Sequence, residues 1–286
     1  MLTRRVIPVV LIKNEVVVQS RNFKEYFPVG RPEIAVKYLN DWGADEILLL
    51  DIGASKYGNS PNFSLIESCA NSSNVPLTVG GGISSLEDAQ RIFDSGADKL
   101  SLNSSANNKL FLEISVIFGA QAIVLAVDTK FVNGENLLYD YKSNSVKELP
   151  ILDYIKLFNH DLFGEIIIQS ADRDGLKTGY ELNFLHKAAN EINKPIIALG
   201  GYGSPVDLNS LFKNSGISAG AIGNSVHHFE HSLIVIKSNL DNDLGIRFET
   251  QANYNDLSLD IYARVKKRSE SFLNELLYQR ITQEDI

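Results

Sequence analysis

Eight short apolar runs recur along the 286-residue chain, and a longer amphipathic stretch separates each run from the next. Most runs are bounded by Gly, Pro, Asp or Asn, and they are rich in Val, Ile and Leu on both faces. Continuous hydrophobicity of this kind is typical of parallel strands that are covered on both sides. The runs are Val6–Ile12, Glu46–Asp51, Leu77–Val79, Lys99–Leu102, Ala122–Asp128, Glu165–Ser170, Ile196–Leu199 and Gly220–Gly223.

The stretches between the runs have helical spacing, as in Pro32–Trp42, Ser85–Ser95 and Pro205–Asn214. Ser84 and Ser204 stand where the N-caps of the last two helices belong. Strand and helix that alternate eight times indicate an α/β fold. Eight units of regular spacing favour a closed (β/α)8 TIM barrel over a doubly wound open sheet.

The two halves of the chain resemble each other. The segment Pro76–Ser84 is echoed by Pro195–Ser204, and Ser95–Ser105 is echoed by Ser215–Ser225. Both echoes lie about 120 residues apart, so we expect a barrel built from two fused half-barrels. The same offset sets Leu11 against Asp128, so the second half has a carboxylate where the first half has a leucine.

The last part of the chain does not follow the barrel pattern. It is polar and charged from about Asp241, with one predicted helix from about Leu257 to Arg280. We therefore expect a barrel over residues 1–240 and a C-terminal extension over residues 241–286. For its helix, packing on the barrel exterior is favoured over a partner-binding arm.

Composition excludes several classes of protein. Lys and Arg number 27 against 35 for Asp and Glu, and the resulting net charge of −8 argues against broad nucleic-acid binding. The single cysteine, Cys69, fits a reducing compartment. No stretch approaches the roughly 18 apolar residues of a membrane helix. We expect a cytoplasmic protein with no membrane or nucleic-acid partner.

Loops of glycine and small polar residues follow four of the runs. Gly80–Gly82 and Asn103–Ser104 follow the third and fourth runs, and Gly200–Gly203 and Gly223–Ser225 follow the seventh and eighth. Chemistry in such barrels lies at the C-terminal ends of the strands, and glycine lets backbone N–H groups approach an oxyanion. The loops predict two phosphate sites on opposite sides of one mouth. Tight turns are the alternative for any single loop.

Carboxylates follow two further runs. Asp128 ends the fifth run, where it could act as a general acid or base, or could simply cap its loop. In Asp172–Gly175, after the sixth run, Asp174 could orient substrate and Gly175 could add an N–H; a structural Asp–Arg turn is the alternative. His227 and His228 have no partners at metal-ligand spacing, so no metal site is predicted.

Charged residues stand at the start of four runs, which places them at the opposite, bottom rim. Two positive and two negative charges there could pair into a closed layer. Stabilisation of the barrel bottom is the usual meaning of that face. The four residues are Arg5, Glu46, Lys99 and Glu165.

Together these motifs resemble HisF, the cyclase subunit of imidazole glycerol phosphate synthase, from Met1 to about Phe229. The resemblance implies a barrel with two phosphate sites, a glutaminase docked on its N-terminal face, an ammonia passage through the core, and no cofactor. The matching motifs are Leu2–Arg5, Val79–Ile83, Gly96–Lys99, Ala126–Lys130, Ser170–Gly175 and Gly200–Gly201.

The resemblance also implies roles for single residues. The passage entrance of the family matches the four charges at Arg5, Glu46, Lys99 and Glu165, and Asp98 matches a position that contacts the glutaminase. The phosphate positions match Gly82, Asn103 and Ser104 on one side and Gly175, Gly201, Asn224 and Ser225 on the other.

The chain departs from the family at Leu11. The cyclase uses two carboxylates, at the ends of strands one and five, to close the imidazole ring and split its substrate. Asp128 keeps the second carboxylate, but a leucine cannot exchange protons. Loss of one such group typically removes 10²–10⁴-fold in rate. Gln19 also replaces a lysine that the first loop of the family brings over the substrate.

Three functions follow from these observations. The favoured one is similar to a divergent branch in surface-polysaccharide biosynthesis, in which a HisF-like barrel and a HisH-like glutaminase deliver ammonia to a sugar amidotransferase that makes an acetamidino group. The second is a true cyclase that makes imidazole glycerol phosphate and AICAR from PRFAR and ammonia in histidine biosynthesis. The third is a phosphosugar-binding barrel without ammonia traffic.

Overall fold

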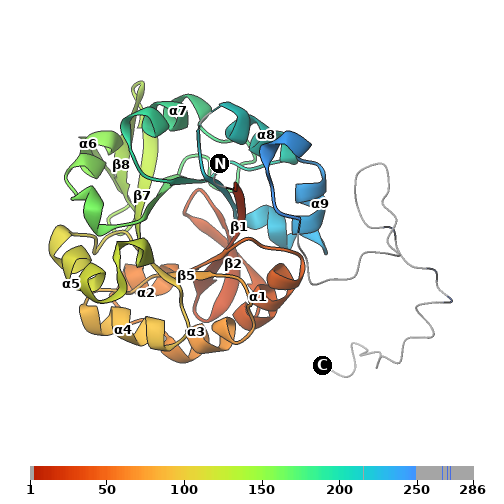
Figure 1. Cartoon of the computed structure of the whole chain (residues 1–286), viewed down its shortest axis with the longest axis horizontal. Coiled ribbons are helices and arrows are strands. Elements are labelled where there is room, and N and C mark those ends of the chain that lie inside the picture. Colours follow the sequence, from red (N-terminus) through yellow and green to blue (C-terminus); the bar gives the residue numbers. More distant parts are fainter. Residues whose placement is uncertain (1–2, 215, 249–265, 267–268, 270, 272–286) are drawn as a thin grey trace. The chain divides into compact units, whose positions relative to one another are not determined.

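In the computed structural model, which describes residues 3–214, 216–248, 266, 269 and 271, eight parallel strands close into a barrel (Figure 1). The last strand pairs with the first, so that Arg5 lies opposite Ala219. The predicted (β/α)8 barrel is confirmed. In order around the barrel, the strands are β1 (Arg5–Lys13), β4 (Ile47–Asp51), β5 (Leu77–Gly80), β6 (Lys99–Leu102), β7 (Ile123–Val132), β10 (Glu165–Ser170), β11 (Ile196–Leu199) and β12 (Ala219–Ile222).

Helices and short 3-10 turns connect the strands around the outside of the barrel (Figure 1). Ser85, rather than the predicted Ser84, caps the fourth helix, because its side chain accepts a hydrogen bond from the N–H of Asp88. The helices are α1 (Pro32–Asp41), α2 (Ile52–Tyr57), α3 (Phe63–Ala70), α4 (Leu86–Asp94), α5 (Asn108–Phe118), α6 (Ile151–Lys156), α7 (Leu182–Glu191), α8 (Pro205–Asn214) and α9 (Ser232–Ser238), with turns η1 (Ala120–Ala122), η2 (His160–Leu162), η3 (Asn224–His227) and η4 (Asn242–Leu244).

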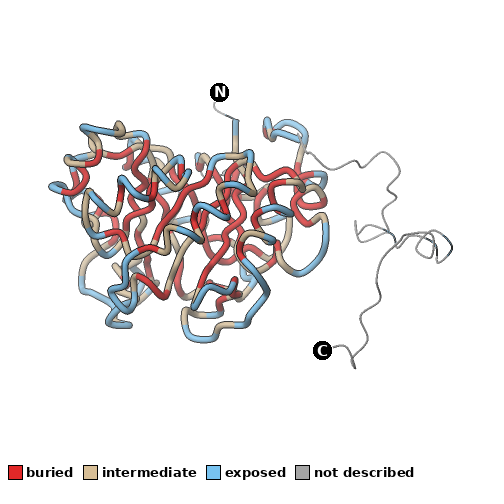
Figure 2. The backbone as a smooth tube through the Cα atoms, turned by 90° about the horizontal axis from the view of Figure 1, so that it is seen from below, coloured by how far each residue is buried: buried red, intermediate tan, exposed pale blue. Residues whose placement is uncertain are grey.

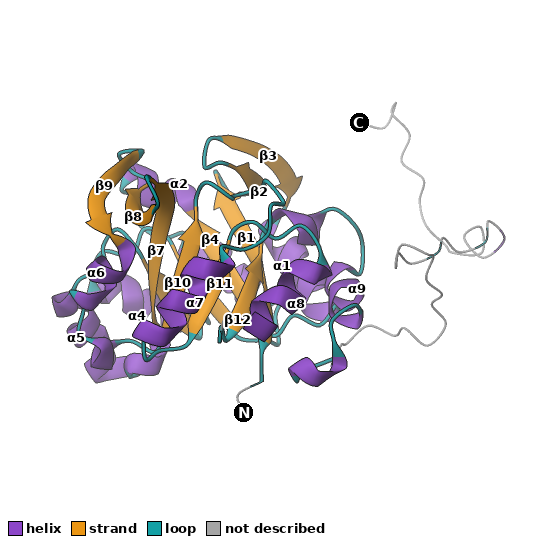
Figure 3. Cartoon of the chain, turned by 90° about the horizontal axis from the view of Figure 1, so that it is seen from above, coloured by secondary structure: helices purple, strands orange, loops and turns teal. Residues whose placement is uncertain are grey.

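Two antiparallel excursions were not predicted. β1 continues into β2 (Val16–Arg21) and β3 (Glu25–Gly30), here called hairpin 1. β7 continues into β8 (Glu135–Asp140) and β9 (Ser145–Pro150), here called hairpin 2. Both rise on the side of the barrel away from the N-terminus (Figure 3). They therefore stand at the C-terminal ends of the barrel strands, which we call the mouth.

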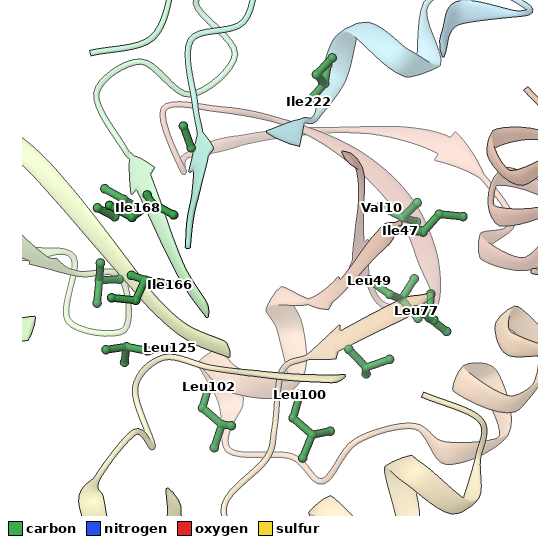
Figure 4. Close-up of a cluster of buried hydrophobic side chains, with 14 of the residues drawn as sticks. Val10, Ile47, Leu49, Leu77, Leu100, Leu102, Leu125, Ile166, Ile168 and Ile222 are labelled. Atoms are coloured by element: carbon green, nitrogen blue, oxygen red, sulfur yellow. The ribbon is translucent and has the colours of Figure 1, made fainter. Parts of the chain in front are cut away.

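The apolar core has two layers, one on each side of the barrel wall. Val10, Leu49 and Ile168 point outward from the strands into the layer beneath the helices (Figure 4). A smaller cluster fills the inside of the barrel, and buried residues follow the strands through the molecule (Figure 2). Burial on both faces explains why the strands have no polar alternation. The inner cluster contains Ile7, Val9, Leu11, Val18, Leu48, Val124, Ile167, Ile197, Leu199, Ala219 and Ala221.

The residues after α9 contact the start of the barrel. The buried ammonium of Lys237 lies 2.7 Å from the carboxylate of Asp45 and 3.0 Å from the carbonyl oxygen of Arg247. Ile246 forms a parallel bridge with Arg4. Two compact units, Met1–Ala252 and Asn253–Ile286, are distinguished.

The proposed division into a barrel and an extension stays a prediction. The helix predicted from Leu257 to Arg280 lies outside the described residues, apart from Lys266, Ser269 and Ser271. No helix in the described part of the chain is long and apolar enough to cross a membrane.

Candidate functional site

Asp128 brings a buried carboxyl group to the mouth. It lies near the middle of the extended strand β7 and is 4% exposed. Burial raises its pKa to about 7, although a hydrogen bond from the side-chain amide of Asn103 (2.8 Å) opposes the shift. The nearby carboxylates of Asp174 and Asp140 raise this pKa further. A carboxyl group with this pKa can both donate and accept a proton near neutral pH.

Leu11 supplies an apolar side chain at the matching place on β1. It pairs in register with Leu50 of β4 and belongs to the inner apolar cluster. A neighbouring carboxylate, Asp51 at the end of β4, was not singled out from the sequence. Its Oδ1 accepts a 2.8 Å hydrogen bond from the N–H of Ala54, which makes it the N-cap of α2, and burial raises its pKa.

A cavity of about 210 Å³ opens beside Asp128. The predicted residues of the first phosphate site, Gly82, Asn103 and Ser104, all line it, together with Leu11. The N–H of Gly82 donates a hydrogen bond to the hydroxyl of Ser55 (3.0 Å). We call this space the first cavity.

A second, smaller cavity of about 40 Å³ lies on the other side of the mouth. The residues predicted for the second phosphate site meet there. Leu11 and Gln169 line both cavities, so they stand at the boundary between the two. The predicted residues that line the second cavity are Asp174, Gly175, Gly201, Asn224 and Ser225.

Hairpin 1 is held against the second cavity. The side-chain amide of Asn224 accepts from the N–H of Ser20 (3.0 Å) and donates to its carbonyl oxygen (2.6 Å). The carboxylate of Asp174 accepts from the hydroxyl of Ser20 (2.6 Å) and the N–H of Phe23 (3.1 Å), and burial raises the pKa of Asp174. Gln19 donates to the carbonyl oxygen of Asn224 (3.3 Å). In this structure, two predicted ligand-binding residues therefore position a hairpin.

The turn of hairpin 2 lies over the first cavity, which Tyr141 and Lys142 line. Tyr141 lines the first cavity together with Ser55 and Ser104, and burial raises its pKa. The rings of Phe23 and Tyr139, one from each hairpin, lie 5.8 Å apart between centroids. The two hairpins thus meet above the mouth. Their contribution to the site was missed because neither hairpin was predicted.

The four charges at the bottom rim form a closed ring of ion pairs. Arg5 lies 2.7 Å from Glu46 and 3.1 Å from Glu165, and Lys99 lies 2.9 Å and 3.4 Å from the same two carboxylates. The hydroxyl of Thr78 donates a 2.6 Å hydrogen bond to Glu46. We call these four residues the charged ring; their role as an ammonia entrance stays a prediction.

Asp98 and the two histidines lie outside these groups. The carboxylate of Asp98 accepts a hydrogen bond from the N–H of Leu77 (2.8 Å), and its role as a glutaminase contact stays a prediction. Burial lowers the pKa of His227 to about 4 and also lowers that of His228. Among the described residues, no group of three or more His, Cys, Asp or Glu side chains could hold a metal ion.

Comparisons with known proteins cover most of the chain. The profile of the family described as "Histidine biosynthesis protein" matches residues 5–232. A Vibrio vulnificus protein, provisionally named imidazole glycerol phosphate synthase subunit hisF2, is 35% identical over 267 residues, which cover 92% of this chain and 98% of the relative. A Halalkalibacterium halodurans protein, named imidazole glycerol phosphate synthase subunit HisF, is 35% identical over 244 residues (84% and 97%). A Pseudomonas aeruginosa protein, provisionally named hisF2, is 36% identical over 241 residues (82% and 96%).

Proposed function

The chain belongs to the histidine biosynthesis protein family as a HisF member, and on that premise we propose that it receives ammonia from a HisH-like glutaminase and conveys it through the barrel to the mouth. The acceptor enzyme we propose is a sugar amidotransferase that forms an acetamidino group. In this function the chain need not close an imidazole ring itself.

The single observation that carries this proposal is the replacement of one acid–base group by Leu11. Cyclisation requires one group to donate a proton and another to accept it. Asp128 can do either, but Leu11 does neither, and Asp51 is engaged as the N-cap of α2. We therefore expect cyclase chemistry to be impaired while the barrel itself remains intact.

Polar side chains support a route from the charged ring to the first cavity. Glu46 precedes β4, Thr78 lies on β5 and Ser101 lies on β6, and these strands are adjacent in the barrel. Thr78 is bonded to Glu46, and Ser101 lines the first cavity. Small polar groups along one wall would offer hydrogen bonds to a passing ammonia molecule.

The mouth also presents apolar side chains that could contact an acceptor enzyme. Phe27 and Val29 on hairpin 1 are 51% and 43% exposed, and Phe131 at the end of β7 is 53% exposed. Exposed aromatic and aliphatic side chains are typical of surfaces that bind other proteins. This supports delivery to a separate protein at the mouth.

A second candidate, a working cyclase in histidine biosynthesis, is favoured by a different observation. The residues predicted for each phosphate site line one cavity, and burial raises the pKa of Asp128 to about 7. In that case Asp128 would share the proton transfers with another group. The candidate is Asp51, a carboxylate at the end of β4 that lines the same cavity.

One experiment separates these functions. The purified chain is supplied with free ammonia and PRFAR, and loss of PRFAR is followed. Ammonia bypasses the glutaminase, so only this subunit is tested. We expect negligible turnover with an intact fold by circular dichroism, together with stimulation of a HisH-like glutaminase on mixing. Clear turnover would establish the cyclase instead. No complex with the glutaminase would indicate a phosphosugar-binding barrel.

A further inference from the structure

Hairpin 2 carries a lysine that the proposed function does not use. Lys142 follows Tyr141 and lines the first cavity together with Gly82 and Ser104. We propose that the ammonium group of Lys142 binds the phosphoryl group of a phosphate monoester in this cavity. The proposal rests on the predicted first phosphate site and adds a cation from hairpin 2 to it.

The backbone of Lys142 is fixed by its neighbours. The carboxylate of Asp140 accepts hydrogen bonds from the N–H of Lys142 (3.0 Å) and from the hydroxyl of Ser143 (2.7 Å), which closes the turn. The preceding residue, Tyr141, lines the cavity together with Ser55 and Ser104. The backbone of Lys142 is therefore held beside the residues that would contact the phosphate.

Three other lysines near the mouth are already engaged. Lys13 and Lys130, near the bases of the two hairpins, lie over the rings of Tyr26 and Tyr139 at 4.2 Å and 4.1 Å from the centroids. Lys147 pairs with Asp140 at 3.5 Å. Within the described part of the chain, no carboxylate forms an ion pair with Lys142.

Hairpin 1 brings no cation into the first cavity. Its Gln19 is neutral and donates to Asn224 at the second cavity, and its Lys24 lines neither cavity. Lys56 also lines the first cavity, but it belongs to the last turn of α2, where the helix dipole already favours a positive charge. The exposed side chain of Lys142 is thus the hairpin cation available to the ligand.

The chemistry of this arrangement suits a phosphate monoester. The hydroxyl groups of Ser55, Ser104 and Tyr141 line the cavity and can offer directed hydrogen bonds, and an ammonium group contributes a compact positive charge. Loss of the ammonium group should weaken binding roughly tenfold or more, because the phosphate then loses a charge-assisted hydrogen bond.

The test measures binding of ribose 5-phosphate to the full chain by calorimetry, with ribose as the probe that lacks phosphate. We expect Lys142→Gln to weaken binding of ribose 5-phosphate at least tenfold and Lys142→Arg to retain most of it. Lys24→Gln is the matched control, because it removes the same charge from the other hairpin; it should leave affinity unchanged.

Amide chemical shifts identify which site responds. In the wild type, ribose 5-phosphate should shift the signals of Gly82 and Ser104, and Lys142→Gln should diminish those shifts more than any at Gly201 and Ser225. Equal affinities for the wild type and Lys142→Gln, with shifts at Gly82 retained, would overturn the role of Lys142. Absence of binding by the wild type would instead overturn the first phosphate site itself.

Discussion

The side-chain amide of Asn103 donates a 2.8 Å hydrogen bond to the carboxylate of Asp128, across the gap between two adjacent strands of the barrel. Asn103 thereby orients a carboxyl group whose pKa burial has raised to about 7. On β1, the side chain that reaches the same cavity is Leu11. One side of the site is therefore prepared for proton transfer, and the other side is apolar.

Replacing Leu11 tests whether positions 11 and 128 form an acid–base pair. Leu11→Asp should raise PRFAR turnover at saturating ammonia by about 10²-fold or more over the wild type, since it returns a proton-transferring group to the cavity. Leu11→Asn has a similar shape but no acidic proton, so it should stay at the wild-type level. If both folded variants behave alike in the ammonia-driven assay, the pairing of these two positions is wrong.

The pKa of Asp128 should appear in the pH dependence of stability. The carboxyl binds its proton more tightly in the folded protein (pKa about 7) than in the unfolded chain (3.8). The resulting stabilisation is complete below pH 4 and is lost as the pH rises to about 7. In urea titrations across that window, the free energy of unfolding should therefore fall with pH by on the order of 2–4 kcal/mol less in Asp128→Asn than in the wild type.

Two other carboxyl groups, one buried and one half-buried, share the sign of this effect. Burial raises the pKa of Asp51 and of Asp174, so some decline with pH should remain in Asp128→Asn. The exposed Asp94 on α4 supplies the control, because Asp94→Asn should follow the wild-type curve. A wild-type slope that is unchanged in Asp128→Asn would contradict the raised pKa.

The charged ring should respond unequally to loss of its two carboxylates. Glu46 is 2% exposed and accepts from Thr78 as well as from both cations of the ring. Glu46→Ala should lower the free energy of unfolding by about 3 kcal/mol, because two cations keep only Glu165 as a partner. Glu165→Ala should cost less. Denaturant titrations in which Glu165→Ala is the more damaging change would refute this ranking.

Lys237 should couple the last described helix to the first strand. Its ammonium group bonds to Asp45, which also accepts from the N–H of Val6 (2.8 Å). Lys237→Met should lower the free energy of unfolding by about 3 kcal/mol and speed hydrogen exchange at Val6, since a buried carboxylate loses its main partner. Lys213→Met removes an exposed lysine that pairs with Asp241 and should change neither quantity. Unchanged exchange at Val6 in Lys237→Met would show that the coupling is absent.

The barrel was predictable because its strands have a simple signature. A strand covered on both faces must be apolar throughout, and each of the eight runs became a strand within a few residues of its predicted bounds. The hairpins lack that signature, because β3 and β9 are largely exposed. Asn133-Gly134, with positive φ at both residues (50° and 90°), is a strong hairpin signal that could have revealed hairpin 2.

Which residues gather at the mouth was predictable from the sequence, but the contacts between them were not. The residues expected at the first phosphate site line one cavity and those expected at the second line the other, because the strand ends of a parallel barrel meet at one mouth. The contact between Asn224 and Ser20, however, joins two residues 204 positions apart, and Ser20 lies on a hairpin that was not predicted. Local sequence patterns do not encode a contact of that range.

Hairpins 1 and 2 leave the barrel at equivalent points of the internal repeat, after β1 and within the extended β7. Each half thus contributes one hairpin and its own glycine-containing loops to the mouth. Such a chain resembles two gene copies that are translated together. Leu11 in one half and Asp128 in the other show that matching positions of the two halves can carry different side chains. New chemistry can then arise inside a single gene, without a second gene to hold the old function in reserve.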